Sequence, residues 1–140
     1  MSSLLGVDHI AVAVRDLDQA TEQWKNRLGL RVGAREIVED QGVEVQMMYA
    51  GDTRIELVRP IREDSPIHKF LERKGEGLHH LALAVDNCKE AVAQCEADGA
   101  QMIDREPRTG AHNTTIAFCH PKSVNSVLLE LVEGGEGPWQ

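Results

Sequence analysis

The feature that most constrains the fold of this chain is a repeat between its two halves. Residues 7–14 (VDHIAVAV) align with residues 78–85 (LHHLALAV), and this alignment places His9 over His80. Each segment carries an imidazole followed by an uncharged run of small and branched residues, which is typical of a strand buried on both faces. Buried imidazoles at equivalent points of two strands need partners, and a metal ion is one candidate.

The repeat continues along the rest of each half. Three pairs of positions mark it: His9 and His80 lie 71 residues apart, Gly29 and Gly99 lie 70 apart, and Glu56 and Glu130 lie 74 apart. Nearly constant offsets across a whole half indicate two copies of one supersecondary unit, neither of which can bury its sheet alone. The chain of 140 residues is long enough for the two copies to share one core.

We therefore expect a single domain over residues 1–140, with modules at 5–59 and 76–134 and a connector at 60–75. Each module is predicted to have the order β-α-β-β-β. The expected strands are 7–14, 30–38, 43–49 and 54–58 in the first module, and 78–85, 100–104, 114–119 and 127–132 in the second.

Local signals predict where the helices begin and end. Asp16 suits an N-cap, and Gly29 can close the same helix in a left-handed conformation. In the second module the equivalent helix opens at Asp86 or Asn87. The connector is expected to contain a short capped helix with Pro66 at its first position.

Each module supplies one histidine in its first strand and one glutamate in its last strand. These residues are His9, Glu56, His80 and Glu130. If the first and last strands of each module are neighbours, all four side chains can point into one concave sheet. A glutamate buried in an apolar strand is costly unless it is paired or coordinated. Two imidazoles and two carboxylates suit a first-row divalent ion that keeps positions open for substrate.

The alternative interpretation is that each glutamate simply faces solvent on an alternating strand. For a single glutamate this alternative would be preferred, but four repeat-matched positions favour the metal site. His79 is expected to pack on the opposite face of its strand from His80, because side chains alternate along a strand.

Composition argues against several kinds of partner. The formal net charge of -8 disfavours nucleic acid, which attracts basic surfaces. No segment approaches the length needed to span a bilayer and residues 1–6 lack a signal-peptide pattern, so no membrane partner is expected. The three cysteines are an odd number without metal-like spacing, which favours a reduced, cytoplasmic location. Cys88 and Cys95 would share a helix face seven residues apart and are expected to be core thiols. The glycine-rich segment 134–138 is expected to be loosely held.

Several segments spread over nearly the whole chain resemble one protein family. They are residues 8–14, 41–43, 64–67 (DSPI) with 69–71, 75–80 (GEGLHH), 107–108 with 110–112, 120–123 (HPKS) and 127–131. With these segments and the doubled βαβββ plan, the chain resembles the methylmalonyl-CoA epimerases of the vicinal oxygen chelate, or glyoxalase, superfamily. The resemblance implies an α+β fold in which two tandem βαβββ modules form a curved mixed sheet around a central metal site.

The resemblance also implies an activity and a set of site residues. The family interconverts (2R)- and (2S)-methylmalonyl-CoA by moving the proton on C2 through a metal-stabilised enolate. Its metal positions fall on His9, Glu56, His80 and Glu130. The implied ion is divalent, namely cobalt, zinc, manganese or nickel. Glu130 is also the usual candidate for one of the two catalytic bases.

Other members of the superfamily give alternative functions. A glyoxalase I-type isomerase (lactoylglutathione lyase), which acts on a glutathione hemithioacetal, uses a nearly identical ligand set and is the main alternative. A non-catalytic binding module and an extradiol dioxygenase fit the four residues less well.

Three departures from the family pattern concern the site. Val45 stands where some members carry the second base, a glutamate, so the second base is left open between Glu44 through a shifted register, Glu56, and a water near the metal. Asn113 and residues 125–126 replace positions where relatives usually have glycine or a small glycine-rich turn. Both changes lie where the mouth of the site is expected.

An acyl-CoA substrate carries phosphates that an acidic chain repels on average, so positive charge must be gathered locally. Lys122 and Arg108 are the residues expected to bind CoA, with Arg62 and Lys69 as further sources of charge. A homodimer is also expected, because open curved sheets leave edges and apolar faces to be covered.

Overall fold

A computed structural model describes residues 2–135 of the chain. Its contacts divide the chain into two compact units, which we call the N-terminal unit (His9–His79) and the C-terminal unit (residues 2–8 and 80–135). The part of the predicted loose tail from residue 136 onward lies outside the described residues.

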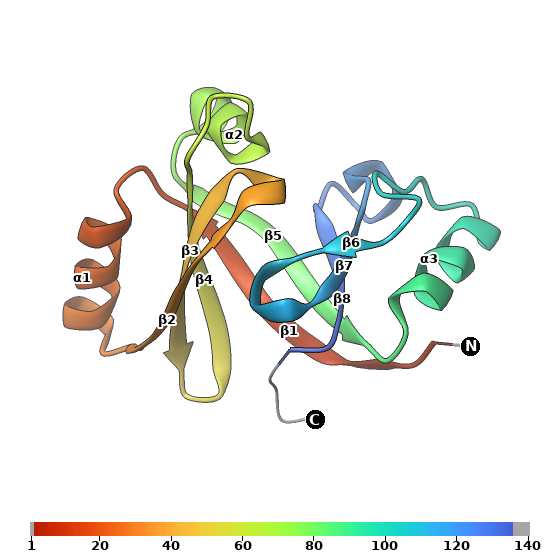
Figure 1. Ribbon diagram of the computed structural model, residues 1–140, viewed down its shortest axis with the longest axis horizontal. Coiled ribbons are helices and arrows are strands. Elements are labelled where there is room, and N and C mark those ends of the chain that lie inside the picture. The colour runs from red at the N-terminus through yellow and green to blue at the C-terminus, as the bar shows by residue number, and fades with distance from the viewer. Residues whose placement is uncertain (1, 136–140) are drawn as a thin grey trace. The chain divides into compact units, whose positions relative to one another are not determined.

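The N-terminal unit contains the first βαβββ arrangement and the connector helix (Figure 1). Its elements are β1 (Leu4–Ala13, whose first residues belong to the other unit), α1 (Leu17–Leu28), β2 (Arg31–Val38), β3 (Val43–Ala50), β4 (Thr53–Pro60) and α2 (Pro66–Lys74). The strands are ordered β2-β3-β4-β1. The pairing of β1 with β4 is parallel, and the other two pairings are antiparallel.

The predicted caps of the N-terminal unit are confirmed. The Asp16 side chain accepts a hydrogen bond from the Gln19 N–H at 2.9 Å, and Gly29 ends α1 with φ at 76°. The Ser65 side chain caps α2, and Pro66 is at the start of that helix, where its missing N–H costs nothing. These caps fix where the helices begin.

One face of the N-terminal sheet is covered by α1. The apolar residues of this core are Val12, Val14, Leu17, Ala20, Met48 and Leu57, packed by Trp24, Leu30 and Ile55. Trp24 is therefore a packing residue, as its helical spacing predicts. Since side chains alternate along each strand, the other face of this sheet carries the remaining side chains of β1, β3 and β4.

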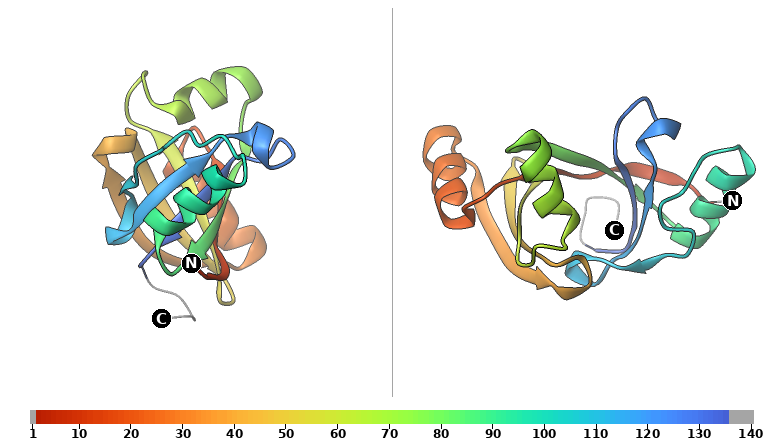
Figure 2. Two further views of the ribbon diagram at one scale, coloured as in Figure 1. Left: turned by 90° about the vertical axis from the view of Figure 1, so that its right-hand side faces the viewer. Right: turned by 90° about the horizontal axis from the view of Figure 1, so that it is seen from above.

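The C-terminal unit repeats the same order of elements. They are β5 (Gly77–Val85, whose first three residues belong to the other unit), α3 (Cys88–Ala97), β6 (Arg108–Thr109), β7 (Thr115–Cys119) and β8 (Leu129–Glu133). The strand order is β5-β8-β7-β6, with β5 and β8 parallel. Helix α3 packs against β7 and β8 (Figure 2). The predicted α+β class with two βαβββ modules is therefore confirmed.

The choice between the two predicted openings of α3 is resolved. The Asn87 side chain accepts a hydrogen bond from the Glu90 N–H at 3.0 Å, so Asn87 is the N-cap. Asp86 instead accepts hydrogen bonds from the Ser3 N–H at 2.7 Å and the Ser2 hydroxyl at 2.9 Å. The hydrogen bond from the Ser3 backbone is the main reason why the pKa of Asp86 is lowered.

The strand predicted at 100–104 is wrong. Met102 makes only an isolated bridge with Cys119, and the regular pairing begins later, in the two-residue strand β6. The chain bends because the N–H groups of both Ile103 and Asp104 donate to the Phe118 carbonyl, at 2.9 Å and 3.2 Å. The Asp104 carboxylate also accepts a hydrogen bond from the Phe118 N–H at 2.9 Å. A side chain thus takes the hydrogen bond that a backbone carbonyl of a paired strand would accept.

The sequence departures at 113 and 125–126 fall on left-handed backbone. Asn113, Asn125 and Ser126 have φ of 59°, 58° and 68°. Glycine adopts this conformation without strain, and asparagine tolerates it better than most residues.

None of the helices in residues 2–135 is long and apolar enough to cross a membrane.

Candidate functional site

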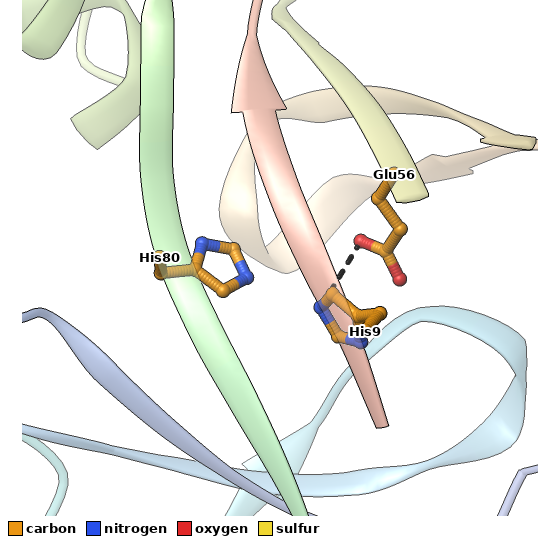
Figure 3. Close-up of side chains that lie close together, drawn as sticks. All are labelled: His9, Glu56 and His80. Carbon is orange, nitrogen blue, oxygen red and sulfur yellow. Dashed lines mark ion pairs between the residues drawn. The ribbon is translucent and has the colours of Figure 1, made fainter. Parts of the chain in front are cut away.

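A buried histidine and glutamate meet on the N-terminal sheet. The parallel register of β1 and β4 places Ala11 opposite Glu56, and His9 precedes Ala11 by two residues, so His9 and Glu56 share a face. His9 Nε2 lies 3.4 Å from Glu56 Oε1, and their side chains are only 5% and 7% exposed. Figure 3 shows this contact as a dashed line and also labels His80 on β5.

The C-terminal unit contains a second pair built in the same way. The parallel register of β5 and β8 places Ala82 opposite Glu130, and His80 precedes Ala82 by two residues. His80 Nε2 lies 3.1 Å from Glu130 Oε1, and these side chains are 7% and 6% exposed. The ring of Phe118 meets the His80 imidazole edge to face, with centroids 5.3 Å apart. The predicted side-by-side position of the first and last strands holds within each unit.

Each pair combines an imidazole nitrogen with a carboxylate oxygen in a place that water hardly reaches. A buried carboxylate needs a positive partner or hydrogen bonds. First-row divalent cations bind imidazole nitrogens and carboxylate oxygens. One pair supplies only two such ligands, so a four-coordinate site needs further ligands from protein or substrate. The donor chemistry of the two pairs therefore fits the metal ion that the family resemblance implies.

The structure does not bring Glu44 together with the His9–Glu56 pair. Val45 pairs with Val58, which shares the face of Glu56, so its neighbour Glu44 points to the α1 face of the sheet. There the Glu44 carboxylate accepts a hydrogen bond from Arg59 at 2.8 Å. The shifted register that would have moved Glu44 to the other face is absent from β3 and β4.

The two residues predicted to bind CoA both lie in the C-terminal unit. Arg108 on β6 is half-buried, pairs in register with Ile116, and has its Nε 3.3 Å from an oxygen of Asp104. Lys122 is exposed in a short 3-10 turn (Pro121–Ser123), where its N–H donates to His120 Nδ1 at 3.0 Å. The Lys122 side chain is accessible to a charged ligand.

The remaining predicted histidine has a packing environment. His79 lies edge to face against Phe70, with ring centroids 4.9 Å apart. The prediction that His79 packs away from the His80 face agrees with this contact.

Sequence reasoning missed Glu36, a half-buried glutamate on β2. The antiparallel register pairs Glu36 with Val45, so both lie on the face that carries Glu56. Counting along the strand could not assign this face, because the register of β2 shifts between Val32 and Arg35. Gln46 lies at this register shift, where its side-chain amide donates a hydrogen bond to the Gly33 carbonyl at 2.9 Å.

The chain matches the model of the Glyoxalase/Bleomycin resistance protein/Dioxygenase superfamily over residues 8–118. It is 42% identical over 127 residues to the uncharacterized protein YqjC of Bacillus subtilis, covering 91% of each chain. It is 39% identical over 127 residues to the ethylmalonyl-CoA/methylmalonyl-CoA epimerase of Cereibacter sphaeroides, covering 89% of this chain and 95% of the relative.

Two solved structures share the fold along nearly the whole chain. A variant of the Streptomyces coelicolor methylmalonyl-CoA epimerase, in complex with 2-nitronate-propionyl-CoA, has a TM-score of 0.91 and 35% identity, covering 96% of this chain and 100% of that chain. A methylmalonyl-CoA epimerase in complex with methylmalonyl-CoA and NH4+ has a TM-score of 0.89 and 35% identity, covering 97% and 100%. The chain therefore belongs to the Glyoxalase/Bleomycin resistance protein/Dioxygenase superfamily and is a homologue of the methylmalonyl-CoA epimerases.

Proposed function

We propose that this chain is a metal-dependent methylmalonyl-CoA epimerase. The observation that carries the proposal is the buried His–Glu pair that recurs in the same register in both units. His9, Glu56, His80 and Glu130 would together bind one divalent ion. The homology to epimerases, including one solved in complex with methylmalonyl-CoA and NH4+, supports this substrate.

The proton to be moved lies on C2 of the substrate, between a carboxylate and a thioester, and is too weakly acidic to leave unaided at neutral pH. A divalent cation, when bound, supplies positive charge beside the oxygens that gain negative charge as the enolate forms. Glu130 is the base that takes the C2 proton. Inversion needs a second group that returns a proton to the opposite face of the planar enolate.

The surroundings of Glu130 suit a base that must work in a dry site. Ala82, Phe118 and Val132 belong to one apolar cluster on its face of the sheet. This cluster excludes water, which would compete for the proton and weaken electrostatic interactions. Phe118, packed on His80, also holds the imidazole in a fixed orientation.

Lys122 and Arg108 provide positive charge for the CoA part of the substrate. Lys122 is exposed in the Pro121–Ser123 turn, whose backbone is held by the hydrogen bond to His120. Its ammonium can therefore reach a phosphate with little further loss of backbone entropy. Arg108 is more buried and lies on the same face of the sheet as Glu130, since its partner Ile116 pairs with Val132.

We place the enzyme in the cytoplasm as a homodimer. Cys88, Cys95 and Cys119 are free thiols, which suits a reducing compartment. Burial raises the pKa of Cys88 to about 12, which fits a packing role. Light scattering at micromolar concentration tests the dimer, and a monomeric mass would contradict it.

Exchange of the C2 hydrogen of methylmalonyl-CoA in heavy water, with the metal-loaded protein, tests the reaction class. We expect fast exchange together with interconversion of the two C2 epimers. In Glu130→Gln, interconversion should be lost and exchange should be lost for the epimer whose proton faces Glu130, with the metal content retained at a reduced level. No exchange by the metal-loaded wild type would refute the epimerase proposal. Turnover of a glutathione hemithioacetal in its place would identify a glyoxalase I-type isomerase.

A further inference from the structure

Glu36 on β2 lies on the same sheet face as Glu56 on β4, with β3 between them. The β2–β3 register pairs Glu36 with Val45, and the β3–β4 register pairs Val45 with Val58, two residues after Glu56. Residues paired directly across neighbouring strands project to the same face. Glu36 and Glu56 therefore approach one stretch of surface from the two sides of β3.

The surface between these two carboxylates is apolar. Val38, Val43, Val45 and Met47 are 7%, 2%, 2% and 4% exposed. Among strands β1–β4, all of whose residues are described, Glu36 and Glu56 are the acidic side chains on this face, since Glu44 points to α1. Glu36 is a half-buried acid at the rim of this apolar face.

We propose that Glu36 is the second acid/base group of the site, and this inference rests on the proposed epimerase function. Val45 leaves this chain without a titratable group at the position where the resemblance to the epimerases implies a catalytic glutamate in some members. Glu36 is the residue directly opposite that position on the next strand. The Glu36 carboxylate, carried by the neighbouring strand β2, would take the place of the carboxylate that Val45 does not provide.

The spacing suits a small planar substrate. Neighbouring strands lie about 4.8 Å apart, so Glu36 starts about 10 Å across the sheet from β4. A gap of this width leaves room beside Glu36 for the acyl part of the substrate, which is only a few atoms wide. The apolar floor formed by Val45 keeps water from protonating the enolate unselectively.

The carboxyl groups of Glu36 and Glu130 together carry one proton through each turnover. For one C2 epimer, ionised Glu130 takes the C2 proton, and the electrons of the C2–H bond pass to the thioester oxygen to form the enolate. Protonated Glu36 then gives its proton to the opposite face of C2, where the returning electron pair forms the new C–H bond. The groups end with exchanged protonation states, from which the reverse reaction begins.

The test compares Glu36→Gln with wild type by two readouts, interconversion and exchange at C2, using metal-loaded protein and each pure C2 epimer in heavy water. We expect interconversion to fall by about 100-fold or more, the usual contribution of a general acid or base. Exchange at C2 should persist for the epimer whose proton faces Glu130 and fall for the other. Glu22→Gln, an exposed acid on α1, is the matched control and should behave as wild type.

A rescue variant separates chemistry from structure. In Glu36→Gln/Val45→Glu the carboxylate returns one strand closer to β4, and interconversion should recover by at least 10-fold over Glu36→Gln. Unchanged interconversion in Glu36→Gln, or equal loss of exchange for both C2 epimers without rescue, would overturn the role of Glu36. A wild type that neither exchanges nor interconverts the substrate would instead remove the proposed function itself.

Discussion

The proposal of one shared metal ion makes a sharp prediction about single-ligand variants. Each unit offers two ligands, one nitrogen and one oxygen, which is half of the set that a four-coordinate site needs. If both pairs hold the same ion, His9→Ala and His80→Ala should each reduce the metal content from one ion per chain to nearly zero. If each pair held its own ion, either variant would leave half of the metal in place.

The stability change that accompanies metal loss can be estimated. At free metal 100 times above the dissociation constant, binding stabilises the fold by about 2.7 kcal/mol. For 140 residues, an unfolding entropy of roughly 2.1 cal/mol/K per residue gives about 0.3 kcal/mol/K. Removing the ion should therefore lower Tm by about 9 °C. A chelator should produce this shift in wild type and almost none in His9→Ala or His80→Ala.

The assay combines elemental analysis of the dialysed protein with thermal unfolding, with and without chelator. His68→Ala is the matched control, because His68 on α2 also contacts a glutamate, Glu72, at 3.2 Å but is half-exposed. It should keep the full metal content and the chelator shift. Half-occupancy in His9→Ala, or two ions per wild-type chain, would refute the shared site.

Three further predictions address substrate binding, the backbone and pH. Lys122→Ala should raise KM for methylmalonyl-CoA about 10-fold with little change in kcat, in line with the loss of one charge-assisted contact, and an unchanged KM in steady-state assays would exclude the contact. Gly29→Ala should destabilise the protein by about 1 kcal/mol in urea unfolding, because φ is 76° while no atom obstructs the new methyl group, and unchanged stability would contradict this backbone argument. The pKa of Asp86 is lowered from 3.8, so its hydrogen bonds with Ser2 and Ser3 stabilise the fold above that value and are lost as pH falls through the folded-state pKa. Asp86→Asn should therefore lower Tm at pH 7 and change it little at pH 2, and an equal change at both pH values would contradict the linkage.

Sequence reasoning reached the His–Glu pairs because a repeat reports on both modules at once. The offsets between His9 and His80 and between Glu56 and Glu130 need no knowledge of register, since equivalent residues occupy equivalent places. The caps at Asp16 and Ser65 were equally accessible, because capping is a local hydrogen bond. Those parts of the fold depend on spacing or on neighbours along the chain.

The parts that were missed depend on register between strands. The segment 100–104 has apolar residues at strand-like positions, yet the Asp104 carboxylate takes the Phe118 N–H and ends the ladder. The face of Glu36 could not be counted from Val32, because the bulge between Val32 and Arg35 changes the alternation. In both cases a long-range partner decides the outcome, and a single sequence carries no record of that partner.

The register also shows a position at which the two modules differ in charge. Glu36 and Arg108 are equivalent in the repeat, since each lies opposite a buried aliphatic residue, Val45 and Ile116, on the next strand. The buried histidines and glutamates are identical in both modules, but these two edge positions carry opposite charges. A metal ion can bind the same histidine and glutamate donors from both modules. Methylmalonyl-CoA is asymmetric, because it has a proton to be moved at one end and anionic groups to be bound at the other. On the proposed function, both modules keep the same histidine–glutamate pair. Their edge strands differ, since one carries the acid Glu36 and the other the base Arg108. This difference lets a duplicated fold bind an asymmetric substrate.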